Sequence, residues 1–319
     1  MQLFQGSSES QKMKLVAWLV FPLMLALVGC INRPETKIID LSDLQSLDLN
    51  QTQGIVPLRL AVANVISPTG TLESYSALVD YISEKLGRPV ELVQRRTYAE
   101  TNDLVRQGEV DIAFVCTSAY VIGHEEFGME LLVVPQVNQE TVYYSYLIVP
   151  SESEADSMED LQGMTFAFTD PLSNSGRLYP TFLVHQLGEI PESFFGRTFF
   201  TYSHDDAIQA VANGLADGAA VDSLVFQFTL SRNPDLGDQI RVIHKSPPFG
   251  IPPVVIGPQV RPQVHVELQE LFLGMDADPL AANALRELDI EKFVLIGDTA
   301  YDSVRELLSF EEEIALEHR

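Results

Sequence analysis

The sequence predicts an α/β protein with two lobes, each a mostly parallel β-sheet flanked by helices. From Leu58 onward, short β-rich runs alternate with helical periods, which is the pattern of parallel sheets covered by helices. Two similar βαβ sets follow one another, and 319 residues are enough for two domains. A single large doubly wound sheet is the alternative, because long α/β domains also occur as one unit.

The first βαβ set contains four expected strands separated by three helices. The strands are expected at 58–63, 90–94, 111–115 and 131–134, and the helices at 72–86, 99–107 and 118–124. Gly87, followed by Pro89, is the expected stop of the first helix, because glycine readily adopts the left-handed conformation that ends a helix.

The second set follows a crossing strand at 143–149. Its strands are expected at 165–168, 198–201, 218–221 and 240–244, and its helices at 176–187, 205–213 and 223–230. Residues 250–257 are the expected second crossing, and helical patterns at 263–273, 280–288 and 302–308 should pack back on the first lobe. The predicted lobes are therefore 57–146 with 251–319, and 147–250. The acidic run 311–313 is expected to be an exposed helix end.

The N-terminus predicts export. Lys12 and Lys14 precede an apolar run at 15–28, which is too short for a spanning helix of roughly 20 residues. The run ends in Leu-Val-Gly-Cys30, which resembles the lipobox of bacterial lipoproteins. We therefore expect a lipoprotein signal peptide at 1–30, lipidation of Cys30, a tether at 31–56, and a location in the periplasm or on the outer face of the cytoplasmic membrane. A signal anchor or a plain secretory signal is the alternative.

The charge composition argues against nucleic acid as a partner and limits how an anion can be bound. Asp and Glu number 45 against 20 Lys and Arg, which gives a formal net charge of −25. Nucleic acid needs a basic surface, so it is not an expected partner. Any anion site must be a local arrangement of dipoles and aimed donors. If Cys30 is lipidated, Cys116 has no disulfide partner, and no cofactor is expected.

The candidate site follows from where strands end. Ligands of open α/β sheets lie beyond the carboxyl ends of the strands, which selects the turns at 116–118, 170–176 and 203–204, and Asp222. The segment 169–176 carries several hydroxyl groups and opens a helix, where free backbone N–H groups and the helix dipole favour an anion. An ordinary N-cap cluster is the alternative.

The order of these motifs resembles a known family. The chain is similar to the phosphonate, phosphite and phosphate binding proteins of ABC transporters. The similarity is carried by Asp-Pro-Leu-Ser-Asn-Ser-Gly at 170–176, Tyr-Pro at 179–180, Tyr-Ser-His at 202–204, Ala-Val-Ala-Asn-Gly at 210–214, Asp217 and Asp222. The likeness runs from about residue 58 to residue 308. It implies a type II periplasmic-binding-protein fold, capture of a small oxyanion without catalysis, and an ABC transporter permease as partner.

The resemblance also implies a set of ligand-binding residues. The hydroxyl-rich loop would grip the oxyanion, His204 would add a donor, Asp222 would read a ligand amine or hydroxyl, and Tyr98 would close the cleft from the first lobe. The full expected set is Tyr98, Cys116, Thr117, Ser118, Ser173, Asn174, Ser175, the Gly176 amide, His204 and Asp222.

Cys116 departs from the usual family pattern. At the start of a helix its pKa is expected to fall, which favours a thiolate, and a thiolate suits trivalent arsenic better than phosphorus. The turn also resembles the arsenite-binding sensor branch of the superfamily, whose partner is a membrane histidine kinase. The alternative is a small buried side chain in the core.

Other functions have weaker support. Ser175, His204 and Asp222 have the residue types of a hydrolase triad, but no G-x-S-x-G motif surrounds the serine, so an enzyme is not expected. A purely structural lipoprotein is a third possibility. His124, Glu125 and Glu126 are potential metal ligands by residue type. They are consecutive and point to different sides of a helix, so no metal site is expected there. The crossing-strand tyrosines at 143, 144 and 146 are expected to pack and brace the hinge.

Overall fold

The computed structural model describes residues 56–317, which belong to one compact unit, Gly54–Arg319. The predicted signal peptide, Cys30 and the tether up to residue 55 lie outside the described residues. Among the residues described, no helix is both long and apolar enough to cross a membrane.

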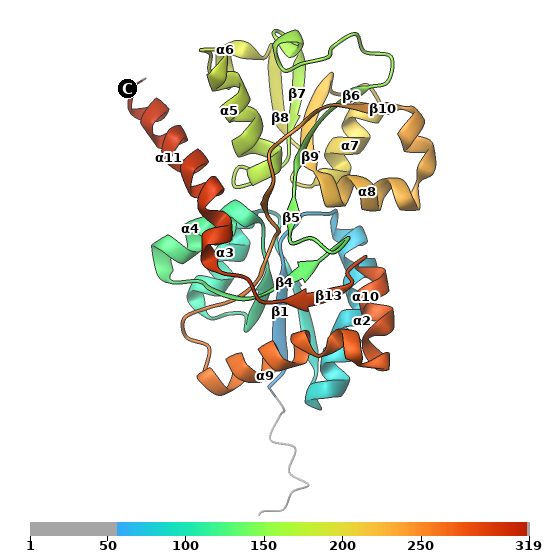
Figure 1. The fold of residues 1–319 in the computed structure, drawn as a ribbon, viewed down its shortest axis with the longest axis vertical. Coiled ribbons are helices and arrows are strands. Elements are labelled where there is room, and N and C mark those ends of the chain that lie inside the picture. The colour runs from blue at the N-terminus through green and yellow to red at the C-terminus, as the bar shows by residue number, and fades with distance from the viewer. Residues whose placement is uncertain (1–55, 318–319) are drawn as a thin grey trace, which may run out of the picture. The chain divides into compact units, whose positions relative to one another are not determined.

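A six-stranded sheet, in the order β13-β4-β12-β3-β1-β2, forms the first lobe (Figure 1). β1 pairs in parallel with β2 and β3, whereas β12 runs antiparallel to its neighbours β3 and β4. The first four strands therefore share one direction, and β12 and β13 oppose it. The strands are β1 (Leu58–Val62), β2 (Val90–Gln94), β3 (Ile112–Phe114), β4 (Glu130–Gln136), β12 (Val254–Ile256) and β13 (Lys292–Val294).

A five-stranded sheet, in the order β10-β6-β9-β7-β8, forms the second lobe. β7 pairs in parallel with β8 and β9, while β6 runs antiparallel to both β9 and β10. Only β6 therefore opposes the common direction, and the predicted mostly parallel architecture is confirmed. The strands are β6 (Ser145–Pro150), β7 (Thr165–Phe168), β8 (Arg197–Phe200), β9 (Gly218–Asp222) and β10 (Ile240–Lys245).

Two short strands mark where the chain crosses between the lobes. β5 (Val142–Tyr143) pairs antiparallel with β11 (Phe249–Gly250). β5 leads directly into β6 of the second sheet, and β11 precedes β12 of the first sheet. The predicted two crossing strands are confirmed.

The helices cover both faces of each sheet (Figure 1). Those of the first lobe are α2 (Pro68–Leu86), α3 (Tyr98–Gln107), α4 (Thr117–Phe127), α9 (Pro262–Leu273) and α10 (Ala282–Glu287). Those of the second lobe are α5 (Tyr179–Gln186), α6 (Pro191–Phe194), α7 (His204–Ala212) and α8 (Ser223–Arg232), and α11 (Asp302–Glu317) ends the described chain.

Local sequence signals explain the ends of the helices that carry predicted site residues. The Thr97 hydroxyl accepts a hydrogen bond from the Glu100 amide, and the Glu100 carboxylate accepts one from the Thr97 amide at 3.0 Å. This capping box places Tyr98 in the first turn of α3. Gly108 then ends the helix with a φ of 68°, which favours glycine.

Alternation along the strands builds a core on each face of the first sheet. Leu60 of β1 packs in a cluster with Ile82 of α2, while its neighbour Ala61 belongs to a second cluster with Val105 of α3 and Tyr120 of α4. All are buried. Because both faces are packed, the carboxyl ends of β1 and β3 are held in fixed positions toward the second lobe.

The last helix corrects two predictions. α11 extends to Glu317 instead of ending at residue 308, and it contacts α5 in the second lobe as well as α4 in the first. The Phe310 ring packs edge-on against Phe182 of α5 at 5.3 Å between centroids. Glu311 pairs with Arg177 and is only half-buried, so the acidic run is not simply an exposed end. Apolar residues that continue the helical period beyond residue 308 explain the greater length.

Candidate functional site

The hydroxyl-rich loop ends β7 and opens a continuous helical segment. Residues Asn174–Leu178 form one turn of π-helix that runs directly into α5. Ser173 caps this turn, because its hydroxyl accepts a hydrogen bond from the Gly176 amide at 3.0 Å. Such single π turns often mark functional positions in helices. The expected helix start is therefore present, with a wider first turn than that of an ordinary α-helix.

Gly176 corrects the prediction that its amide would grip the ligand. That amide is already bonded to Ser173. A Cβ at position 176 would lie 1.9 Å from the Thr169 Oγ1 atom, so only glycine fits there. Glycine is needed because the Thr169 side chain lies against the backbone of residue 176, which is a packing role.

Four polar atoms near this loop are buried without a hydrogen-bond partner. They are Thr169 Oγ1, Asn174 Oδ1 and Ser175 Oγ from the second lobe, and the Tyr98 hydroxyl from the first. Ser175 and Tyr98 are both 0 % exposed. Since leaving such a group unpaired costs about 1–3 kcal/mol, a cluster of them at a predicted site indicates groups suited to a polar ligand.

His204 begins α7 and is held as a neutral donor. Its Nδ1 atom accepts a hydrogen bond from the Asp222 amide at 3.0 Å, and its Nε2 atom lies 3.4 Å from the Ser173 hydroxyl. Burial lowers the pKa of His204 to about 3. Because Nδ1 is an acceptor, the neutral ring must carry its proton on Nε2. The predicted donor role for His204 is consistent with this geometry.

Asp222 ends β9 and caps α8. Its Oδ1 atom accepts hydrogen bonds from the amides of Leu224 at 2.7 Å and Val225 at 3.3 Å. Burial raises the pKa of its carboxyl to about 7 despite these bonds, which favour the charged form. Asp222 therefore gains a proton near neutral pH, and in that form it could donate to an anion.

The first lobe meets the loop through α3 and α4. The Tyr98 amide donates to the Asp170 carboxylate at 3.1 Å, and the Ser118 hydroxyl donates to the Leu172 carbonyl. Thr117 differs, because its hydroxyl donates at 2.9 Å to the Gly250 carbonyl of the crossing strand β11. The structure thus brings Tyr98 and Ser118 to the loop and places Thr117 on the hinge.

Cys116 corrects a second prediction. Its side chain is 3 % exposed and packs with Ala63, Tyr98 and Ala119. Burial raises the pKa of the thiol to about 11, and hydrogen bonds from the backbone of Asn174 and Ser118 only partly oppose this rise. The desolvation cost therefore exceeds the effect of the helix start, so Cys116 is a neutral thiol and not the expected thiolate.

Tyr143 is a site residue that the sequence reasoning assigned only to packing. Its buried hydroxyl accepts a hydrogen bond from the Asn174 side-chain amide at 2.9 Å. Burial raises the pKa of Tyr143, and Cys116 and Asp222 would each raise it further in their ionised forms, so the three groups lie close together. The only signal in the sequence was a tyrosine on the first crossing strand, which by itself does not show which way the ring points.

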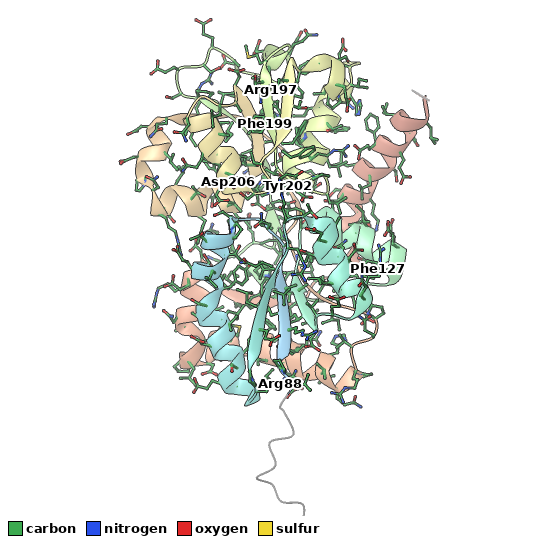
Figure 2. The ribbon with its side chains drawn as sticks, turned by 180° about the vertical axis from the view of Figure 1, so that it is seen from behind. Arg88, Phe127, Arg197, Phe199, Tyr202 and Asp206 are labelled. Carbon is green, nitrogen blue, oxygen red and sulfur yellow. The ribbon has the colours of Figure 1, made fainter. Side chains whose placement is uncertain are left out.

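Three further hydrogen bonds join the lobes around the site. The Asn64 side chain donates to the Tyr202 carbonyl at 2.9 Å, the Ser67 amide to the Asp205 carboxylate at 2.8 Å, and the His204 amide to the Val65 carbonyl at 2.9 Å. Tyr202 lies where the two lobes meet (Figure 2). The carboxyl end of β1 therefore docks on the start of α7.

Comparison with known proteins identifies the family. Residues 60–301 match the family model described as "ABC transporter, phosphonate, periplasmic substrate-binding protein". The "Phosphate-import protein PhnD" of Mycolicibacterium smegmatis is 28 % identical over 253 residues, which cover 73 % of this chain and 78 % of that protein. A probable phosphite binding protein of Prochlorococcus marinus is 26 % identical over 125 residues, 37 % of this chain and 42 % of that protein.

Solved structures share the fold. A binding protein of a Pseudomonas aeruginosa phosphonate transporter superposes with a TM-score of 0.77 at 24 % identity, covering 82 % of this chain and 89 % of its own. The methylphosphonate complex of a Prochlorococcus marinus protein gives 0.71 at 18 % identity, covering 78 % and 96 %. The type II periplasmic-binding-protein fold is confirmed, as is a role in solute binding and not in catalysis. The chain belongs to the family of periplasmic substrate-binding proteins of phosphonate ABC transporters.

Proposed function

We propose that this chain binds a small tetrahedral phosphorus oxyanion where its two lobes meet and delivers it to the permease of an ABC transporter. The second lobe would contribute Ser173, Asn174, Ser175 and His204, and the first lobe Tyr98. The observation that carries the proposal is that Ser175 Oγ and the Tyr98 hydroxyl, from opposite lobes, are both buried without a hydrogen-bond partner. The two lobes meet at this loop, because the Tyr98 amide donates to the Asp170 carboxylate at 3.1 Å.

The donors suit such a ligand because they are neutral. Hydroxyl groups and the Nε2–H of His204 can each donate to an oxyanion, and no Lys or Arg is hydrogen-bonded to these side chains in residues 56–317. Selection then depends on the geometry and number of hydrogen bonds. This arrangement allows a chain with a net charge of −25 to hold an anion locally.

The relatives support phosphorus as the central atom. Their names specify phosphate import, probable phosphite binding and a bound methylphosphonate. The buried thiol of Cys116, with its raised pKa, gives no support to an arsenite site. We therefore do not retain the sensor alternative with a histidine kinase partner.

Two further parts of the proposal concern the whole chain. Sheet membership supports lobe 1 at 57–144 with 251–319 and lobe 2 at 145–250. The predicted boundary at 146/147 moves back by two residues, because Ser145 and Tyr146 of β6 pair with β9 of the second sheet. The lipobox-like sequence supports lipid attachment at Cys30. Cys30→Ala should abolish incorporation of labelled fatty acid in cells, whereas unchanged labelling would contradict the anchor.

The test of ligand class is calorimetric titration of the purified chain. Phosphate, phosphite and methylphosphonate should include at least one ligand that binds at one site per chain, with sulfate and arsenite as controls. Sulfate tests charge and shape together, and arsenite tests the thiol. Binding of arsenite alone, or of none of the five, would contradict the proposal.

A further inference from the structure

A mostly apolar pocket lies next to Asp222, between the two lobes. Its first-lobe walls include Val62 at the end of β1, Phe114 at the end of β3 and Tyr75 of α2. Its second-lobe walls include Leu224 and Phe228 of α8. The volume of the pocket is about 150 Å³.

The pocket adjoins the proposed oxyanion site. Asp222 lines the pocket, and its amide donates to His204, whose Nε2 atom faces Ser173. Ala63, another lining residue, packs in the same cluster as Tyr98 and Cys116. A ligand whose charged group met the donors would therefore have this pocket beside its remaining atoms.

The residues that line the pocket indicate which ligand substituents fit it. Aliphatic and aromatic side chains form most of it, and the polar lining residues are Ser74, Asp222, Gln227 and Asp289, with no Lys or Arg. One oxygen of Asp222 already accepts hydrogen bonds from the amides of Leu224 and Val225. A cavity of about 150 Å³ lined by Leu, Ile and Phe side chains accommodates a benzene ring.

We propose that this pocket receives the carbon substituent of an organophosphonate, and that it selects apolar substituents up to the size of a phenyl ring. The inference rests on the proposed function, since it requires the phosphonate group to bind at the neighbouring donors. Each buried methylene then increases affinity about fourfold.

The first experiment compares four phosphonates by calorimetric titration of the unmodified chain. Butylphosphonate and phenylphosphonate should bind at least about tenfold more tightly than methylphosphonate, because they bury additional apolar surface. Equal or weaker binding of the larger pair would overturn the inference and leave the oxyanion site intact. Tighter binding of 2-aminoethylphosphonate than of butylphosphonate would also overturn it, because Asp222 would then be reading an amine. If no phosphonate, phosphate or phosphite binds, the proposed function itself fails.

The second experiment narrows the pocket from each lobe. Leu224→Trp and Ile66→Trp place a larger side chain on opposite walls, and each should weaken phenylphosphonate binding at least tenfold while methylphosphonate binding changes less than about twofold. Leu215→Trp is the matched control, since Leu215 is 68 % exposed and does not line the pocket. Equal losses for both ligands in both pocket variants would contradict the assignment.

Discussion

At the scale of single residues, two buried titratable groups at the site contribute opposite pH dependences to the stability of the fold. His204 has its pKa lowered to about 3 from 6.5, and Asp222 has its pKa raised to about 7 from 3.8, both by burial. Between about pH 3 and 6.5 the unfolded chain binds the extra proton at His204, so stability rises with pH. Between about pH 3.8 and 7 the folded chain binds the extra proton at Asp222, so stability falls as pH rises.

Single substitutions should expose the two opposing slopes. His204→Gln removes the histidine contribution. The melting temperature of the variant minus that of the unmodified chain should therefore be larger at pH 5 than at pH 7.5. Asp222→Asn keeps a capping side chain and should show the reverse, with a lower relative melting temperature at pH 5. Melting curves across this range check the prediction. Parallel pH profiles for all three proteins would contradict the assigned protonation states.

Gly176 offers a test of packing at the same scale. Gly176→Ala places a methyl group against Thr169, and overpacking of this kind costs about 1–3 kcal/mol of the free energy of unfolding. Gly237→Ala is the matched control, because nothing lies within 4 Å of a Cβ there. Urea unfolding measures both. Equal stability of the two variants would show that the close approach at Thr169 is not restrictive.

The sequence predicted which residues gather at the site better than it predicted their chemical state. Ser173, His204 and Asp222 are joined by hydrogen bonds as the strand-end argument requires. The state of Cys116 could not be predicted, because its pKa depends on burial by Tyr98 and other residues distant in sequence.

At the scale of elements, strands with a clear apolar run were predicted well and short or inserted ones were not. β2 and β7 have the predicted bounds. β13 has three residues, too few to show a period, and it was missed. The antiparallel insertion of β12 between β3 and β4 is set by pairing across the sheet, which leaves no local signal.

α11 provides a prediction at this scale because it contacts both lobes. It contacts α4, and Tyr301, the residue just before α11, lies 4.8 Å from Tyr120 of α4 between ring centroids. Further along α11, Phe310 packs on Phe182 of α5. Phe310→Ala should remove a contact that favours the joined arrangement of the lobes, and so weaken ligand binding about three- to tenfold. Calorimetric titration measures this effect. Ser309→Ala, at an exposed position on the same helix, should bind normally. Equal affinities of the two variants would show that the Phe310 contact does not favour the joined lobes.

At the scale of the whole described unit, the two crossing strands and the contacts around Tyr98, Ser118 and His204 form one system. Ligand contacts that exist only when the lobes meet would shift an equilibrium between separated and joined lobes. The sequence could predict two lobes from its repeated βαβ sets. It could not predict how closely they meet, because the hydrogen bonds that join them link residues far apart in the chain.

The most direct test of the central claim is the affinity of Ser175→Ala for the phosphorus oxyanion that binds the unmodified chain. The Ser175 hydroxyl is buried without a partner, so its removal should leave the ligand-free melting temperature unchanged or higher. Losing a hydrogen bond to a charged ligand should weaken binding about tenfold or more. Ser76→Ala, at an exposed serine of α2, should bind as the unmodified chain does. Normal affinity in a stable Ser175→Ala protein would contradict the account.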